Sequence, residues 1–474
     1  FANRLQVPIG HPSATEPKGG ITPPTSMEQP GLLKFLCLVL NVAVVVALPS
    51  TANIGSAPNR TSGNGSIITI ELNKQYVPVK RDAKTVMHKA AYFGHVFLGV
   101  PHQQKFTVVF DTGSGHFFIP SAACKNETCQ KHARYNRNLS ESAIDIDHDG
   151  RAVLNDVDRD QVNIQYGTGE ILGDFSREIV CMRAHSGLAL EPAQQSADCV
   201  TVRVITATTM TNDPFTEFAF DGVAGLGLES LALHPEFSFF GQMTRLGLIA
   251  NPRFGVFISR SDHVPSEISF GGHDKRRVQE DIHWSPVASP EKGYWQVAIR
   301  HVSIGDVALD VCEDGQCVAI MDTGSSLLGV PAKEAQDINW KLAREVHDEM
   351  DALDCRNFPG PDIVFDLGGY NITMTAADYS RPAAVQVMDA QTNALKGMIC
   401  RASLLPVDLG DTLSASTFIF GEPMLRKYYT AYDWEKRTIG FALAKEPEAG
   451  ASGSSHQVLG APADSVLTPS VVMV

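Results

Sequence analysis

Phe106-Thr-Val-Val-Phe-Asp-Thr-Gly-Ser114 and Ala319-Ile-Met-Asp-Thr-Gly-Ser325 are the two stretches that decide the fold of this 474-residue chain. In each, apolar strand-forming residues run directly into Asp-Thr-Gly-Ser. Each is followed by an apolar-apolar-Gly triplet, Val223-Ala-Gly225 or Ile419-Phe-Gly421. Such a repeat predicts two related halves that face each other, rather than two unrelated turns at strand ends.

The paired aspartates, Asp111 and Asp322, are the candidate catalytic residues. Hydrolysis of a peptide bond by water needs one ionised carboxylate as base and one protonated carboxyl as acid. Two carboxyls about 3 Å apart cannot both ionise, so they share one proton. The repeat therefore predicts a metal-free hydrolase, in which Asp111 and Asp322 share the roles of base and acid and the pattern assigns neither role to one of them.

The residues after each aspartate are expected to hold the pair in place. A glycine lets the backbone pass close to a carboxylate and offer its N–H. The serine hydroxyl can bond the outer carboxylate oxygen, and the threonine hydroxyl can reach the opposite loop. These supporting residues are Thr112, Gly113, Ser114, Thr323, Gly324 and Ser325.

Charge is distributed unevenly along the chain. The first 90 residues hold nine Lys/Arg and four Asp/Glu, whereas the remainder holds 30 Lys/Arg and 49 Asp/Glu. An acidic body repels phosphate, which argues against nucleic acid as a partner. Short alternating stretches such as 106–110, 162–166 and 67–72 predict a β-rich body. One helix is expected to start at Pro331, with Ile338, Leu342 and Val346 on one face.

The N-terminal part carries a targeting pattern. Phe35–Leu48 is almost wholly apolar but shorter than the roughly 20 residues of a membrane span. With Lys34 before it and small residues after it, the run is typical of a signal peptide that starts at Met27. An uncleaved anchor that tethers the chain to a membrane through 35–48 is the alternative. Either topology predicts a lumenal body in which disulfides form.

From Ala91 to Lys445 the chain resembles the pepsin-like family of aspartic proteases, with a plasmepsin-like or cathepsin D-like character. Besides the two Asp-Thr-Gly-Ser stretches, the matching landmarks in order are Tyr92-Phe-Gly94, Tyr166-Gly-Thr-Gly169, Phe220-Asp-Gly222, Gly293-Tyr-Trp-Gln296 and Arg426-Lys-Tyr-Tyr429. The resemblance implies a mainly β, bilobal fold of two pseudo-symmetric lobes. Between them a cleft with a flap hairpin would hold extended polypeptide substrates that have apolar side chains near the cut.

The resemblance also assigns the residues around the substrate. The flap and substrate-binding candidates are Tyr166, Gly167, Thr168, Gly169, Phe118, Val109, Phe220, Val223, Tyr294 and Ile320. Two positions depart from the family pattern. Phe118 stands where a tryptophan usually donates a hydrogen bond to the flap tyrosine, so a looser flap or a substitute partner is expected. Glu422 stands in place of the usual Asp in the last Gly-Asp-Pro-like turn, with little expected consequence.

The resemblance implies three disulfides: Cys124–Cys129, Cys312–Cys317 and Cys355–Cys400. Cys181 and Cys199 remain as a candidate fourth bridge, and Cys37 lies in the apolar run. A zinc site on the Cys-x4-Cys spacings is the alternative, disfavoured by a lumenal location and the lack of clustered His. No metal or other cofactor is expected.

A basic segment before Tyr92 resembles a propeptide that inhibits its own enzyme, rather than a plain polar linker. One of its lysines would face the aspartates at neutral pH and leave on acidification.

The chain is expected to divide into six parts: 1–26 as a disordered or non-native leader, 27–50 as signal peptide, 51–90 as propeptide, 91–275 and 276–446 as lobes with Asp111 and Asp322, and 447–474 as a disordered tail. We expect a monomeric zymogen that is active in an acidic vacuole, lysosome-like organelle or secretion.

Two further patterns in the sequence concern calcium binding and glycosylation. Asp145-Ile-Asp147-His-Asp149-Gly150 resembles the start of a calcium loop that would run to residue 156, but its flanks favour an acidic surface hairpin. Asn-x-Ser/Thr triplets mark glycosylation candidates at Asn59, Asn64, Asn126, Asn138 and Asn371.

The rival function is a catalytically silent binding protein with the same fold. Loss of either aspartate, or of the glycine beside it, would favour this rival function, and the sequence keeps all four residues.

Overall fold

The computed structural model describes residues 5–6, 67–81, 84–154, 159–185, 196, 198–313, 315–346, 353–389, 391–392, 394–409, 413–447, 456–460 and 471–473. Predictions on residues 10–63, including the signal peptide, Asn59 and Cys37, lie outside these ranges. None of the helices in the described part has the length and apolar content that a membrane crossing requires.

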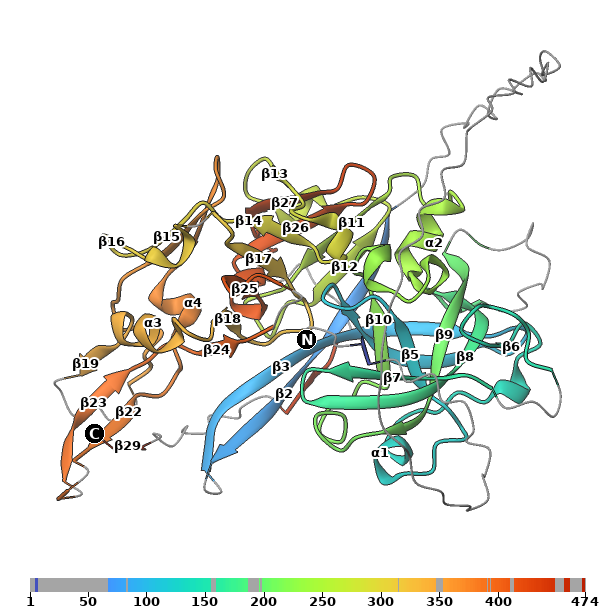
Figure 1. The fold of residues 1–474 in the computed structure, drawn as a ribbon, viewed down its shortest axis with the longest axis horizontal. Helices are drawn as coiled ribbons and strands as arrows, with labels where there is room; N and C mark the ends of the chain where they lie inside the picture. Colours follow the sequence, from blue (N-terminus) through green and yellow to red (C-terminus); the bar gives the residue numbers. More distant parts are fainter. Residues whose placement is uncertain are drawn as a thin grey trace, which may run out of the picture. The chain divides into compact units, whose positions relative to one another are not determined.

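The described chain is mainly β, as the sequence predicted (Figure 1). The largest sheet joins strands from both halves of the sequence, and β2 pairs with β12 where the two halves meet. In spatial order its strands are β1 (Leu5–Gln6), β7 (Gln161–Tyr166), β8 (Gly169–Cys181), β9 (Cys199–Met210), β5 (Phe117–Pro120), β10 (Gly222–Gly225), β4 (Gln104–Asp111), β3 (Lys84–Leu98), β2 (Ile68–Arg81), β12 (Ser266–Phe270), β11 (Arg253–Phe257), β26 (Tyr428–Asp433), β27 (Thr438–Leu443) and β13 (His283–Pro286); β6 (Ile144–Ile146) pairs with β8, and β28 (Val458–Leu459) pairs with β2.

Three smaller sheets complete the second half. The first contains β14 (Gln296–Ala298), β17 (Val318–Met321), β25 (Thr417–Phe420), β18 (Leu328–Pro331) and β24 (Leu404–Val407). The second contains β16 (Val307–Ala308), β15 (His301–Ile304), β20 (Ile363–Asp366) and β21 (Asn371–Met374). The third contains β19 (Arg344–Val346), β23 (Leu395–Cys400), β22 (Val385–Met388) and β29 (Val471–Met473).

Helices are short and lie between strands. They are α1 (Glu127–Gln130), α2 (Phe239–Arg245), α3 (Ala335–Lys341), α4 (Ala376–Tyr379) and α5 (Glu422–Leu425), with 3-10 turns at Arg137–Leu139, Glu229–Leu231, Pro235–Phe237, Lys275–Arg277, Pro290–Lys292 and Asp310–Cys312. The helix predicted to start at Pro331 is present as α3 (Ala335–Lys341), but it is shorter than predicted. Pro331 ends β18 and Val346 belongs to β19, because pairing with β23 extends the chain again.

The internal repeat is confirmed as a repeated strand arrangement. β10 lies parallel to β4, with Gly225 opposite Asp111, and antiparallel to β5. β25 lies parallel to β17, with Phe420 opposite Met321, and antiparallel to β18. The apolar-apolar-Gly triplets therefore lie directly beside the strands that lead to the two aspartates. A large hydrophobic cluster that includes Phe110 and Trp295 packs behind them.

The leading segment is ordered more fully than the sequence suggested. β2 and β3 form a long hairpin (Figure 1), and β3 continues without a break across the expected propeptide boundary at residue 90. Ile68, Ile70 and Leu72 of β2 are buried in the main core. The tail expected to be disordered contributes β28 and β29. Lys74 donates its backbone N–H to the Gln457 carbonyl at 2.9 Å.

The structure contains four disulfides: Cys124–Cys129, Cys181–Cys199, Cys312–Cys317 and Cys355–Cys400. The first, third and fourth are the pairings that the resemblance implied, and the second is the candidate fourth bridge. His185 lies close to the sulfurs of Cys181 and Cys199. Because these sulfurs are bonded to each other, they offer no thiolate to a metal.

The loop that resembled a calcium site is a hairpin, the reading that the sequence favoured. β6 continues into a bridge between Ile146 and Ala152. The Asp145 carboxylate accepts hydrogen bonds from Arg137, at 3.2 Å, and from Arg159, at 3.3 Å. A carboxylate engaged by two guanidinium groups is a poor calcium ligand.

The described glycosylation candidates differ in access. Asn138 and Asn371 are exposed. Asn126 is half-buried: its side-chain amide donates to the Met210 carbonyl at 2.6 Å, and its side-chain oxygen caps α1. Because of these contacts, Asn126 is the least accessible of the three described glycosylation candidates.

Candidate active site

The two aspartates lie at the ends of equivalent strands. Asp111 is the last residue of β4, and Asp322 directly follows β17. Their side chains are almost fully buried, with exposed fractions of 2% and 1%. A buried carboxyl with few partners resists ionisation, so both residues are far from ordinary surface aspartates.

The two threonines tie the aspartate loops together, as the sequence predicted. The Thr112 backbone N–H donates to Thr323 Oγ1 at 3.0 Å, and the Thr323 N–H donates to Thr112 Oγ1 at 3.1 Å. Each hydroxyl then donates across to the opposite strand: Thr112 to the Met321 carbonyl at 2.7 Å, and Thr323 to the Phe110 carbonyl at 2.5 Å. The reciprocal bonds fix one loop relative to the other.

The glycines bring each loop against the opposite carboxyl. A Cβ added at Gly113 would lie 2.8 Å from Cγ of Asp322, and one at Gly324 would lie 2.7 Å from Oδ1 of Asp111. Both distances are shorter than real Cβ contacts allow, so only glycine fits. Each glycine also donates its N–H to the aspartate of its own loop, at 2.9 Å and 2.8 Å.

The two serines differ. Ser325 Oγ donates to Asp322 Oδ2 at 2.7 Å, as predicted. Ser114 Oγ is buried but has no hydrogen-bond partner among the described residues. Its nearness to Asp111 still contributes to lowering that carboxyl's pKa. The predicted hydrogen bond is confirmed for Ser325. For Ser114, the hydroxyl is close enough to Asp111 to lower the pKa of that carboxyl but does not meet the geometry of a full hydrogen bond.

The carboxyls form one titrating pair. Burial, and next to it the charge of Asp322, raise the pKa of Asp111 to about 7. Burial also acts to raise the pKa of Asp322. Hydrogen bonds from Ser325 and Asp111 act in the opposite direction and lower it, so Asp322 is the more acidic of the two carboxyls. A pair split in this way can hold a single proton over a wide range of acidic pH.

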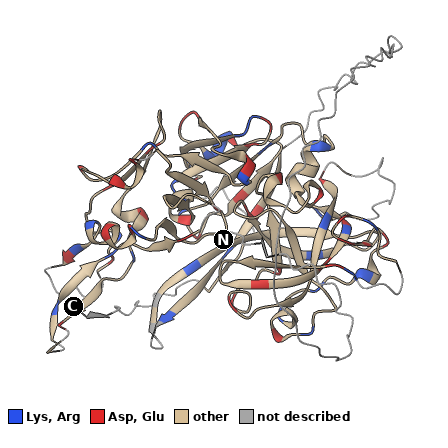
Figure 2. Ribbon diagram, viewed as in Figure 1, with Lys and Arg blue, Asp and Glu red and all other residues tan. Residues whose placement is uncertain are grey.

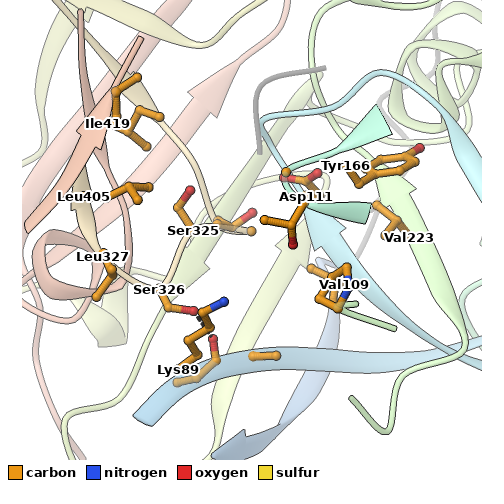
Figure 3. Close-up of a pocket in the computed structure, with 18 of the residues that line it drawn as sticks. Lys89, Val109, Asp111, Tyr166, Val223, Ser325, Ser326, Leu327, Leu405 and Ile419 are labelled. Carbon is orange, nitrogen blue, oxygen red and sulfur yellow. Dashed lines mark hydrogen bonds between the residues drawn. The ribbon is translucent and has the colours of Figure 1, made fainter. Parts of the chain in front are cut away.

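A cavity of about 450 Å³ opens over Asp111 (Figure 3). Its size is ordinary for a binding site. Of the predicted substrate-binding residues, Val109, Tyr166, Gly167, Thr168, Phe220, Val223 and Tyr294 line it. Gly169, Phe118 and Ile320 do not line it. Phe118 is fully buried behind Tyr166, and Ile320 packs with Tyr294 and Leu231.

The predicted flap tyrosine has no polar partner. Tyr166 ends β7 in the β7–β8 hairpin, and its ring centroid lies 5.0 Å from that of Phe118. Its hydroxyl is buried without a hydrogen bond to any described residue. Burial, and then the charge of Asp111, raise the pKa of Tyr166 well above its ordinary value, so it stays neutral. The structure thus supplies neither the indole donor nor a substitute for it among the described residues.

Other cavity-lining residues were not assigned to the cavity from the sequence. They are Lys89, Ala90, Ala91, Tyr92, Gln165, Pro214, Phe215, Phe218, Ser326, Leu327, Leu405, Pro406, Val407, Asp408, Leu409, Leu413 and Ile419. Most lie on strands and loops remote in sequence from either aspartate. Three of them had a signal: Tyr92 and Ile419 belong to stretches that the sequence singled out, and Lys89 belongs to the basic segment from which one lysine was expected to face the aspartates.

Glu422 contributes more than the sequence suggested. Tyr92 Oη donates to Glu422 Oε1 at 2.7 Å. The ammonium of Lys74 lies 3.9 Å from the same oxygen and pairs with Asp262 at 3.0 Å. Because Tyr92 lines the cavity, Glu422 helps to position one of its walls.

Comparison with known proteins agrees with this geometry. Residues 91–444 match the family model described as eukaryotic aspartyl protease. The chain is 29% identical to cathepsin E of Rattus norvegicus over 356 aligned residues, and this alignment covers 74% of this chain and 80% of the cathepsin. It is 30% identical to renin of Canis lupus familiaris over 359 aligned residues, which are 75% of this chain and 79% of the renin. It is 28% identical over 364 residues to the vacuolar aspartic protease of Candida albicans, covering 75% and 76%.

Proposed function

The chain belongs to the eukaryotic aspartyl protease family and is a pepsin-like aspartic-type endopeptidase, and on that premise we propose that Asp111 and Asp322 are its catalytic residues. The reciprocal fit of Gly113 against Asp322 and Gly324 against Asp111 carries this proposal. It requires that the two carboxyls lie next to each other; Asp111 lines the cavity directly, and Thr323, Gly324 and Ser325 line it from the loop of Asp322.

The reaction follows from one shared proton. Asp322, whose pKa is lowered, takes a proton from a water molecule held between the carboxyls. Asp111, whose pKa is raised, donates its proton to the carbonyl oxygen of the substrate as the water oxygen attacks the carbonyl carbon. The resulting tetrahedral diol collapses when the proton on Asp322 passes to the leaving nitrogen. Asp111 recovers its proton from the diol hydroxyl, and the original state returns.

The pH range follows from the same pair. Asp111 loses its proton as pH rises through about 7, and Asp322 gains one only below its ordinary range. Activity is therefore confined to acidic and near-neutral pH, with a bell-shaped profile.

The substrate is an extended polypeptide with apolar side chains near the cut. Val109, Phe220 and Val223 give the cavity apolar walls near Asp111. Tyr166, on the tip of a hairpin, is placed to cover a bound chain and exclude water.

The enzyme is made as a monomeric zymogen in the secretory pathway, with Phe35–Leu48 as its signal sequence. The unbroken pairing of β3 supports a propeptide that ends before Lys84 rather than at residue 90. An acidic vacuole, lysosome-like organelle or secretion suits the pH range. The name of the Candida albicans relative places that protein in a vacuole.

Matched substitutions test the catalytic assignment. Asp111→Asn and Asp322→Asn keep the size of each side chain but cannot supply the base and acid together. We expect each to lower kcat by about a thousandfold or more. Asp306→Asn, on an exposed turn, is the control and should cleave at the wild-type rate. Undiminished cleavage by either active-site variant would refute the assignment of Asp111 and Asp322. A wild type that binds peptides without cleaving them would establish the silent binding protein instead.

A further inference from the structure

Among the described residues that line the cavity, one is a cation, Lys89, and the reaction proposed above does not use it. Lys89 lies on β3, opposite Val77 of β2, and lines the same cavity as Asp111. It is half-buried, and Figure 3 shows its side chain projecting from β3 beside Ser326. No other Lys or Arg is among the described residues that line the cavity.

Lys89 also differs from other lysines of the chain. Lys74, on the neighbouring strand, is buried and paired with Asp262 at 3.0 Å, and Lys427 pairs with Asp378 at 3.0 Å. The described residues give the Lys89 ammonium neither a hydrogen bond nor an ion pair. A half-buried ammonium without a partner is available to an anionic group that enters the cavity.

The backbone at this point is held in place. Ser326 Oγ donates to the carbonyl of Ala90 at 2.7 Å, which ties β3 to the loop that follows Asp322. Lys89 is therefore carried on a strand anchored to the catalytic loop, so its side chain starts from a defined point beside the cavity. From there the flexible lysine stem can bring its ammonium to an anionic group of a bound chain.

The surrounding charge makes the position distinctive. In Figure 2, Lys and Arg colour the β2–β3 hairpin, whereas the body as a whole carries an acidic excess. An acidic substrate approaching this body meets net repulsion. A single ammonium inside the cavity would offset that repulsion at one position of the bound peptide.

We propose that Lys89 is a specificity-determining residue that favours polypeptide substrates with a Glu or Asp side chain at one position away from the two residues that flank the cut. The proposal rests on the proposed function, since it assumes that this cavity binds the substrate. It also requires Lys89 to remain in the active enzyme, which the continuity of β3 and the bond to Ala90 support.

Positional substrate pairs test this. A peptide cleaved by the wild type is varied at each position in turn, with Glu in one member and Gln in the other, at pH 5.5, where a free Glu with a pKa of about 4.3 is ionised. We expect the Glu peptide to have a kcat/KM about five- to tenfold higher at one position. Lys89→Arg should keep this preference, Lys89→Ala should abolish it, and Lys89→Glu should reverse it. Lys105→Glu, an equal charge change at an exposed site of β4, is the matched control.

The outcomes separate the two proposals. If Lys89→Glu prefers the Glu peptide as strongly as the wild type does, or if the wild type shows no preference at any position, the inference about Lys89 is wrong while the aspartate mechanism stands. N-terminal sequencing of the active enzyme gives an independent check. A mature chain that begins after Lys89 would make this lysine part of the removed segment and would overturn the inference. Cleavage that survives Asp111→Asn would instead refute the proposed function.

Discussion

The loops that begin at Asp111 and Asp322 share the sequence Asp-Thr-Gly-Ser but have different surroundings. Both are tied to the opposite loop by a threonine, and both press a glycine against the opposite carboxyl. Only the second loop bonds its serine to its aspartate. The difference teaches that the repeat sets the position of the carboxyls, while the local contacts decide which of them holds the proton.

The surroundings on the Asp111 side reinforce this asymmetry. The uncharged Tyr166 lies near Asp111, and its hydroxyl bonds to no described residue. With one hydrogen bond fewer than Asp322, the Asp111 carboxylate is the costlier of the two to ionise. Substitutions of the glycines, the serines and Phe118 separate the shared features of the two loops from the features that differ.

The largest effect is expected from the shared feature, the glycines. Gly113→Ala places a methyl group against Asp322, and Gly324→Ala places one against Asp111. Each should displace the opposite carboxyl and lower kcat/KM by about a hundredfold or more, since such misplacement is costly to catalysis. Peptide cleavage assays on purified variants measure this.

A matched glycine provides the control. Gly397, on β23, has open space where its Cβ would lie, so Gly397→Ala should retain wild-type activity. If Gly113→Ala were severely impaired and Gly324→Ala were not, the reciprocal arrangement would not be the basis of the site.

The serines should give unequal effects. Ser325→Ala removes a hydrogen bond to an ionised carboxylate, a contact worth about 1.5–3 kcal/mol, or roughly 10- to 150-fold in kcat. Loss of that bond also raises the pKa of Asp322, so the acid limb of the pH–rate profile should move to higher pH. Ser114→Ala should change kcat by less than about threefold, because Ser114 makes no hydrogen bond to lose. Equal losses in the two variants would show that the two loops are equivalent during catalysis.

Much of this site was predictable because it depends on local pattern. Apolar strands that lead into Asp-Thr-Gly fix the carboxyls, and the two threonines and both glycines behave as their chemistry predicted. The β-rich fold also follows from alternating strands.

The rest depends on contacts between segments far apart in the chain. The hydroxyl of Ser114 does not reach hydrogen-bond geometry, although the Asp-Thr-Gly that precedes it is the same as the one before Ser325. Leu405 and Ile419 reach the cavity through the pairing of β24 and β25 with β18, which no local pattern encodes. The predicted helix from Pro331 ends early because pairing with β23 outweighs helical spacing at Val346.

The smallest effect is expected at the flap, where Phe118 gives the Tyr166 hydroxyl no hydrogen-bond donor. Phe118→Trp would bring an indole N–H beside the unpaired Tyr166 hydroxyl. A new hydrogen bond worth about 0.5–1.5 kcal/mol should raise kcat/KM by roughly two- to tenfold through a better ordered flap. The indole must fit where Phe118 is fully buried, so thermal unfolding of the variant shows whether the core accepts it. A double-mutant cycle with Tyr166→Phe isolates the bond, because the gain must vanish when the hydroxyl is absent. A gain that persists with Tyr166→Phe would come from packing, and the missing donor at Phe118 would not limit the flap.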